Sequence, residues 1–273
     1  MTAAVLFATA GVLYRKAVSG SSLHPLLASG LRAGPAFLIV LPAFLATGGT
    51  FSKPIEYYAI AAASAFFAFF VGDSFFIYGL ARAPVGLVYP VAYTFPVFVA
   101  VFNFLLTGRT PSPILLVAAG LMVAGIRLVY GGHNSFSLNG LIAGLMASVS
   151  WGLGISLATV ALRYATPIEL NLFRTGLLLV ATLPALAKNS ESLKRINFKW
   201  LLLGSMLGIG LGPLALFTAI SLSDAVGPSV ISSGAPVFAV VLAVPILKEK
   251  AETRILLGAT LVALATAIST VWG

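Results

Sequence analysis

Ten apolar stretches, each close to the length that crosses a bilayer, make up most of this chain of 273 residues. A membrane-spanning helix needs about 20 mainly apolar residues. Only 8% of the residues are charged, against roughly 25% in soluble domains, so most of the surface suits lipid. The sequence therefore predicts an all-α integral membrane protein with ten transmembrane helices. The predicted spans are residues 2–18, 25–47, 57–80, 85–106, 112–131, 138–161, 168–187, 199–221, 228–247 and 254–271.

The chain also repeats itself. Pro25, Arg32, Gly34 and Pro42 recur 142 positions later as Pro167, Arg174, Gly176 and Pro184, and Pro96-Val97-Phe98 recurs 140 positions later as Pro236-Val237-Phe238. We therefore expect two repeats of five helices each, over residues 1–131 and 138–273. Five crossings are an odd number, so the second repeat enters the membrane from the opposite side. Two inverted repeats are typical of secondary transporters that work by alternating access.

Lysine and arginine are distributed unevenly between the connections. Connections after even-numbered spans carry only Lys53, Arg109 and Arg163. Cytoplasmic connections are enriched in basic residues, so the sequence predicts that both termini lie outside a plasma membrane. Connections after odd-numbered spans carry Arg15, Lys16, Arg82, Arg127, Lys188, Lys194, Arg195, Lys199, Lys248, Lys250 and Arg254.

Composition excludes several classes of protein. The chain has no cysteine, so it has no thiolate chemistry or cysteine-based metal site. Its net charge of +9 is spread over the connections, which does not favour nucleic acid as a partner. No metalloprotease, phosphate-loop or Ser/His/Asp pattern is present. We expect no enzyme activity, no cofactor and no metal; the expected partners are a small-molecule substrate and the lipid bilayer, with the chain a monomer or a homodimer.

Asp73 is the acid placed deepest within a predicted span, about eight residues, or roughly 12 Å of helix, from the nearer end. A carboxylate at that depth costs at least ~2.5 kcal/mol and usually faces a cavity or a partner. One interpretation is a proton or cation site. The other is a structural acid that pairs with an arginine.

Three basic residues are candidates for an anion site. Arg32 and Arg174 occupy equivalent positions in the two repeats, and the guanidinium group binds carboxylates or phosphates through two parallel hydrogen bonds. Both side chains are also long enough to reach the membrane interface. Lys16, near the end of the first span, could counter a carboxylate or anchor the helix at the interface.

Two prolines interrupt the middle of spans. Pro96 and Pro236 each remove a helix hydrogen bond, so we expect kinks that free backbone carbonyls toward a shared cavity. Polar and aromatic side chains cluster near them or in spans expected to converge on the same place, and an aromatic pocket with few polar groups suits an amphipathic solute. The candidate substrate-binding residues of this kind are Tyr78, Tyr89, Tyr93, Trp151, Ser232 and Ser233.

The chain resembles the drug/metabolite transporter superfamily, in its ten-helix branch built from two EamA-type repeats. The residues that carry the resemblance are Arg32 and Arg174, the run from Gly79 to Gly86, the two Pro-Val-Phe segments and Leu247-Lys248-Glu249, where lysine replaces the glycine of the family's Leu-Gly-Glu turn. The resemblance covers nearly the whole chain. It implies export of small metabolites, often amino acids or drugs, commonly coupled to protons.

The sequence thus favours a secondary active transporter that exports amino acids or related small metabolites by alternating access. The alternative within transport is an organic-anion or sugar-phosphate exchanger that uses Arg32, Arg174 and Lys16. Outside secondary transport, a passive channel or a membrane-embedded enzyme stays open. The sequence does not identify the substrate or the coupling ion.

Overall fold

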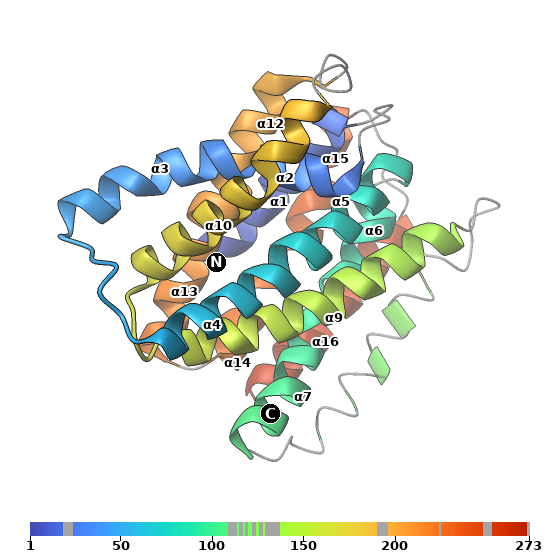
Figure 1. The fold of residues 1–273 in the computed structure, drawn as a ribbon. Coiled ribbons are helices and arrows are strands. Elements are labelled where there is room, and N and C mark those ends of the chain that lie inside the picture. The colour runs from blue at the N-terminus through green and yellow to red at the C-terminus, as the bar shows by residue number, and fades with distance from the viewer. Residues whose placement is uncertain are drawn as a thin grey trace.

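The structure, a computed structural model, describes residues 1–18, 24–83, 85–108, 137–189, 196–223, 225–247 and 253–271, with isolated positions between 114 and 128. Across these ranges the chain forms a bundle of helices without strands (Figure 1). The first half contains α1 (Thr2–Val18), α2 (Pro25–Leu31), α3 (Ala33–Ala46), α4 (Ile55–Ala65), η1 (Phe66–Gly72), α5 (Asp73–Arg82), α6 (Val85–Ala92) and α7 (Phe95–Thr107). The second half contains α9 (Leu138–Ala161), α10 (Pro167–Lys188), α12 (Phe198–Ser205), η2 (Met206–Leu211), α13 (Gly212–Leu222), α14 (Val226–Ser232), α15 (Ala235–Leu247) and α16 (Thr253–Val271).

These elements fall on nine of the ten predicted spans, and the fifth, 112–131, lies outside the described residues except for isolated positions. Seven helical segments of the described chain are long and apolar enough to cross a membrane, and α16 contains a shorter apolar helix. The first span, α1, has 17 residues with Arg15 and Lys16 in its last turn. The predicted all-helical membrane fold is confirmed.

The third and eighth spans share an irregularity. Each contains a π-helical segment, η1 and η2, in which the backbone hydrogen bonds reach one residue further than in an α-helix. The two segments begin at Phe66 and Met206, which are 140 positions apart. Residues of the two repeats that are 140 apart in sequence therefore carry the same local distortion.

The predicted proline kinks take a different form. Tyr93 and Thr94 form a turn between α6 and α7, and Ser233 and Gly234 form one between α14 and α15. Pro96 and Pro236 are each the second residue of the helix that follows. Backbone N–H groups in the first turn of a helix have no intrahelical acceptor, so a proline there removes no helix hydrogen bond. Both spans are therefore broken helices in which the proline starts the second half, rather than continuous helices bent at the proline.

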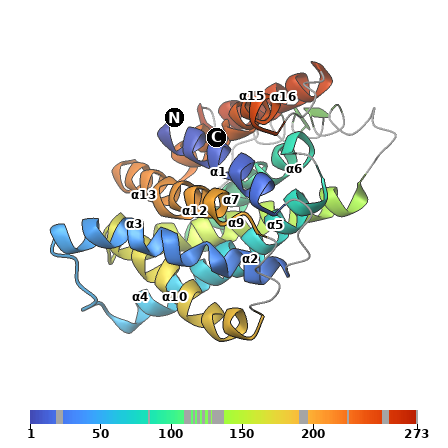
Figure 2. The ribbon, with the colours of Figure 1, turned by 90° about the horizontal axis from the view of Figure 1, so that it is seen from above.

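Helix α9 packs beside α4, α5, α6 and α7 (Figure 1 and Figure 2). Its small residues allow the fourth span to approach closely. A Cβ added at Gly152 would meet backbone and side-chain atoms of Phe98, and the hydroxyls of Ser148 and Thr94 are 2.7 Å apart. Close contact between small residues is the usual way in which helices pack in lipid.

Connections that follow odd-numbered spans meet at one end of the bundle. The guanidinium group of Arg15, near the end of α1, donates to the carbonyl of Leu80 near the end of α5. The Lys16 ammonium lies 4.3 Å from the ring centre of Trp200 at the start of α12. The ends of the first and third spans and the start of the eighth are therefore neighbours.

The other end joins connections that follow even-numbered spans. The Glu169 carboxylate near the start of α10 accepts the Thr50 N–H at 2.9 Å and pairs with the Lys53 ammonium at 2.9 Å. It also accepts the N–H of Thr166, whose hydroxyl accepts the Glu169 N–H, a capping box that starts α10. One carboxylate thus ties the connection after the second span to the start of the seventh.

Candidate functional site

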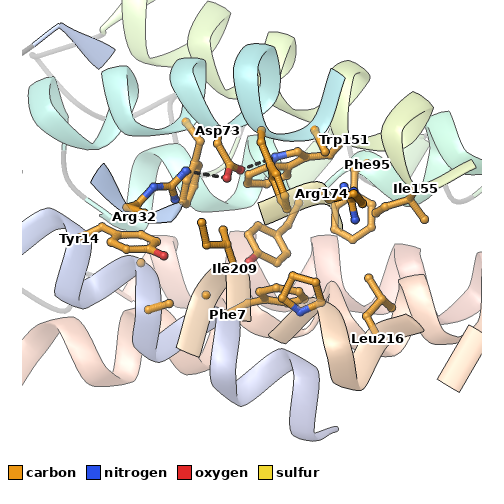
Figure 3. Close-up of a pocket in the computed structure, with 18 of the residues that line it drawn as sticks. Phe7, Tyr14, Arg32, Asp73, Phe95, Trp151, Ile155, Arg174, Ile209 and Leu216 are labelled. Atoms are coloured by element: carbon orange, nitrogen blue, oxygen red, sulfur yellow. Dashed lines mark hydrogen bonds and ion pairs between the residues drawn. The ribbon is translucent and has the colours of Figure 1, made fainter. Parts of the chain in front are cut away.

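A cavity lies in the centre of the bundle and is lined from both halves of the chain (Figure 3). Its walls come from α1, the break between α2 and α3, η1, α5, the break between α6 and α7, α9, α10, η2 and α13. Most of the lining is aromatic or aliphatic. The charged side chains among the lining residues are those of Arg32, Asp73 and Arg174.

Asp73 forms a buried ion pair at one side of this cavity. Its Oδ2 lies 2.6 Å from Nη2 of Arg32, and its Oδ1 accepts the indole N–H of Trp151 at 2.8 Å (Figure 3). The same Arg32 nitrogen donates to the hydroxyl of Ser29 at 3.0 Å. The Arg32 guanidinium also lies 4.6 Å from the ring centre of Tyr14. The pair joins the second, third and sixth spans through charge-assisted hydrogen bonds.

Local backbone structure places the two charges. Arg32 lies at the junction of α2 and α3, where Pro35 has no N–H with which to bond the Leu31 carbonyl. Asp73 is the first residue of α5 and follows directly on η1. Both residues thus come from irregular points within spans, where helix geometry changes beside a cavity.

Arg174 on α10 is buried, with 2% of its surface exposed, and it lines the same cavity. Its Cζ lies 4.5 Å from the ring centre of Phe69 and 4.9 Å from that of Phe217. Its Nε and Nη1 have no hydrogen-bond partner in the described part of the chain. Neither this arginine nor Arg32 extends to the membrane interface, because both side chains turn into the protein.

Aromatic residues from three spans form one wall of the cavity. The rings of Tyr89 and Tyr93 are stacked with centres 4.9 Å apart, and Tyr93 meets Trp151 edge to face at 5.7 Å. The Tyr89 hydroxyl donates to the Phe7 carbonyl at 2.7 Å. Of the predicted substrate-binding residues, Tyr89, Tyr93, Trp151, Arg32 and Arg174 meet at the cavity with Asp73.

Four predicted binding residues lie elsewhere. Lys16 is exposed beside Trp200 at one end of the bundle, and Tyr78 contacts the Arg82 guanidinium at 3.8 Å near the end of α5. Ser232 and Ser233 are buried, but their hydroxyls donate to the carbonyls of Ser229 and Val230, three residues earlier in α14, at 2.7 Å each. These serines stabilise the end of α14 and are not among the residues that line the cavity.

Several lining residues were not singled out by the sequence, although the repeat could have found them. Four positions of the third span line the cavity, and so do the four positions 140 further on. Because equivalent positions of the two repeats line the cavity, a lining residue in one repeat predicts that the residue 140 positions away in the other repeat also lines it. The pairs are Ala68 and Gly208, Phe69 and Ile209, Asp73 and Pro213, and Phe76 and Leu216.

Comparison with known proteins places this architecture in a family. The EamA-like transporter family matches residues 1–131 and 138–271. An uncharacterized transporter from Archaeoglobus fulgidus is 30% identical over 267 residues, which cover 97% of this chain and 94% of that protein. A solved crystal structure superposes with a TM-score of 0.71 at 18% identity, over 98% of this chain and 94% of the other, and shows the shared fold. The chain belongs to the EamA-like transporter family.

Proposed function

We propose that the chain is a secondary active transporter that exports small amphipathic metabolites, amino acids among them, by alternating access around the central cavity. The observation that carries the proposal is the cavity's composition. Apolar and aromatic walls suit the body of an organic solute, and a few buried charges suit its polar end.

The two-repeat arrangement supports the alternating-access part of the proposal. Equivalent positions of residues 1–131 and 138–273 line one cavity, and both repeats carry a π-helical segment beside it. In inverted repeats, rocking of one half against the other opens a central site to each side in turn. At one end of the bundle the basic residue Lys53 is paired with Glu169, whereas the other end carries Arg15 and Lys16. This difference supports an orientation in which the second end is cytoplasmic and both termini are outside.

An organic-anion exchanger is the second candidate, and one observation favours it: Arg174 lines the cavity with N–H groups that have no acceptor among the described residues. Lys16, which the sequence had suggested as a third member of that charge site, lies outside the cavity. In this conformation both carboxylate oxygens of Asp73 accept hydrogen bonds, from Arg32 and from Trp151. Proton binding at Asp73 requires that at least one of these bonds is released during the cycle, and it stays a prediction.

Counterflow tests the proposal. The purified chain is reconstituted into liposomes that are loaded with one unlabelled amino acid or organic acid, and the uptake of labelled solute from outside is followed. A carrier gives uptake that saturates and is accelerated by solute on the opposite side. Uptake that rises linearly and ignores the internal solute indicates a channel and contradicts the proposal.

Two tryptophan variants test whether the solute passes through this cavity. Ile155→Trp adds bulk at a cavity position and should abolish counterflow. Leu38→Trp changes a residue that is 63% exposed on α3, on the surface expected to face lipid, and should leave counterflow unchanged. Equal activity of both variants would show that the solute does not pass through this cavity.

A further inference from the structure

We infer that Arg174 binds the anionic end of the transported solute and that this solute carries a single carboxylate on an apolar body. The inference rests on the proposed transport function and narrows its substrate class. In this arrangement Arg32 binds the Asp73 carboxylate of the protein, and Arg174 binds the carboxylate of the solute.

The hydrogen-bonding state of Arg174 carries the inference. Its side chain is buried and aimed into the cavity, yet its Nε and Nη1 have no acceptor among the described residues. Buried N–H groups are nearly always paired, and an unpaired buried charge is costly. A ligand that brings an anionic acceptor removes this cost when it binds.

The repeat explains why this arginine has no carboxylate partner among the residues that the structure describes. Arg32 and Arg174 are equivalent, and the carboxylate partner of Arg32 is Asp73. The residue 140 positions after Asp73 is Pro213, which lines the cavity but has no acceptor side chain. Both repeats thus have the cation, but the second has a proline where the first has the counterion.

Charge and surroundings select the ligand. Arg32, Asp73 and Arg174 together give the lining a net charge of +1 (two cations minus one anion). One carboxylate neutralises this charge, whereas a phosphate monoester dianion would leave an excess negative charge in a poorly hydrated site. Phe69 and Phe217 lie 4.5 and 4.9 Å from the guanidinium carbon. Aromatic rings at this distance hold a guanidinium by cation–π attraction while its N–H groups stay available to a carboxylate.

Matched acids and amides test the inference on the unmodified chain. Thermal stabilisation in detergent and inhibition of counterflow are measured for propionate, hexanoate and 3-phenylpropionate, each beside its neutral carboxamide. L-phenylalanine is measured beside L-phenylalaninamide, which keeps the amine and lacks the carboxylate, with 2-phenylethylamine as the amine control. The acids should bind about 10- to 100-fold more tightly than the carboxamides, because a carboxamide has no negative charge and an NH2 group in place of one acceptor oxygen. Acids that bind no better than their amides would overturn the inference.

Variants then locate the effect. Arg174→Gln should abolish the preference for acids, and Arg174→Lys should keep part of it, because lysine supplies a charge without the planar fork. Arg163→Gln, at an exposed position, should keep the full preference. An acid preference that persists in folded Arg174→Gln would overturn the assignment. Counterflow of amines or amides but not acids would overturn it while leaving the proposed function intact; no counterflow of any solute would argue against the function itself.

Discussion

Replacing Asp73 by asparagine tests the buried ion pair between Asp73 and Arg32 that lines the cavity. At the observed 2.6 Å and an effective dielectric constant of about 20, the attraction between two unit charges is roughly 6 kcal/mol. Most of that gain is offset by desolvation of the two side chains, which are 1% and 7% exposed. Removing only one partner is different, because the Arg32 guanidinium then stays buried without its counterion, at a cost of ~3–5 kcal/mol.

A double-mutant cycle separates the pair from the rest of the site. Asp73→Asn and Arg32→Gln should each lower the thermal unfolding temperature in detergent, since each leaves a lone buried charge. The double variant places two neutral amides opposite each other and should lose far less than the sum of the single losses. Glu56→Gln, which changes an exposed acid at the start of α4, is the matched control and should have no effect. Additive losses, or an Asp73→Asn variant as stable as the unmodified chain, would refute the reasoning.

The double variant also isolates the role of Asp73 in transport, because it restores the fold without the carboxylate. If Asp73 binds a proton during the cycle, the double variant should still exchange solute by counterflow but should no longer respond to a pH gradient. An unchanged response to the pH gradient would leave Asp73 as a structural partner of Arg32.

Two further predictions concern packing and orientation. Gly11→Ala should destabilise the chain and weaken transport, because a Cβ there would overlap the Tyr89 hydroxyl, whereas Gly34→Ala, whose Cβ would meet only a leucine methyl at 3.9 Å, should be tolerated in the same thermal unfolding assay. In the naturally cysteine-free chain, a cysteine at Gly273 should react with an impermeant maleimide on intact cells and one at Asn189 only after the cells are opened; the reverse labelling would contradict the predicted orientation.

Hydrophobicity and length were enough to predict the fold. The predicted boundaries and the observed elements agree because a helix in lipid must satisfy its backbone hydrogen bonds within itself over the whole apolar run. The sequence did not reveal that spans are interrupted at Arg32, at the π-helical segments or at the turns before Pro96 and Pro236. The pattern of apolar residues does not encode such breaks. Pro35 removes a backbone hydrogen bond beside Arg32, and a π-helical segment changes the hydrogen bonding without changing which residues are apolar.

The site was predicted in part, and the reason is also physical. Asp73, Arg32 and Arg174 were candidates because charge within a span is costly and so needs an explanation. The sequence could not decide whether the arginines reach the interface or the interior, since a long side chain can do either. The two serines were candidates because they lie near Pro236, and Tyr78 because its span was expected to converge on the same cavity; none of the three is among the residues that line it.

Accessibility of the cavity from the two sides of the membrane tests alternating access most directly. Ile209 lines the cavity and is 3% exposed, so Ile209→Cys places the chain's one thiol at the proposed site. Ala61→Cys, at a fully buried position on α4 that does not line the cavity, is the control and should not react. We expect an impermeant thiol reagent to label Ile209→Cys in vesicles of either orientation, and a counterflow-active solute to slow the labelling. Labelling from one side alone, with and without solute, would contradict the account.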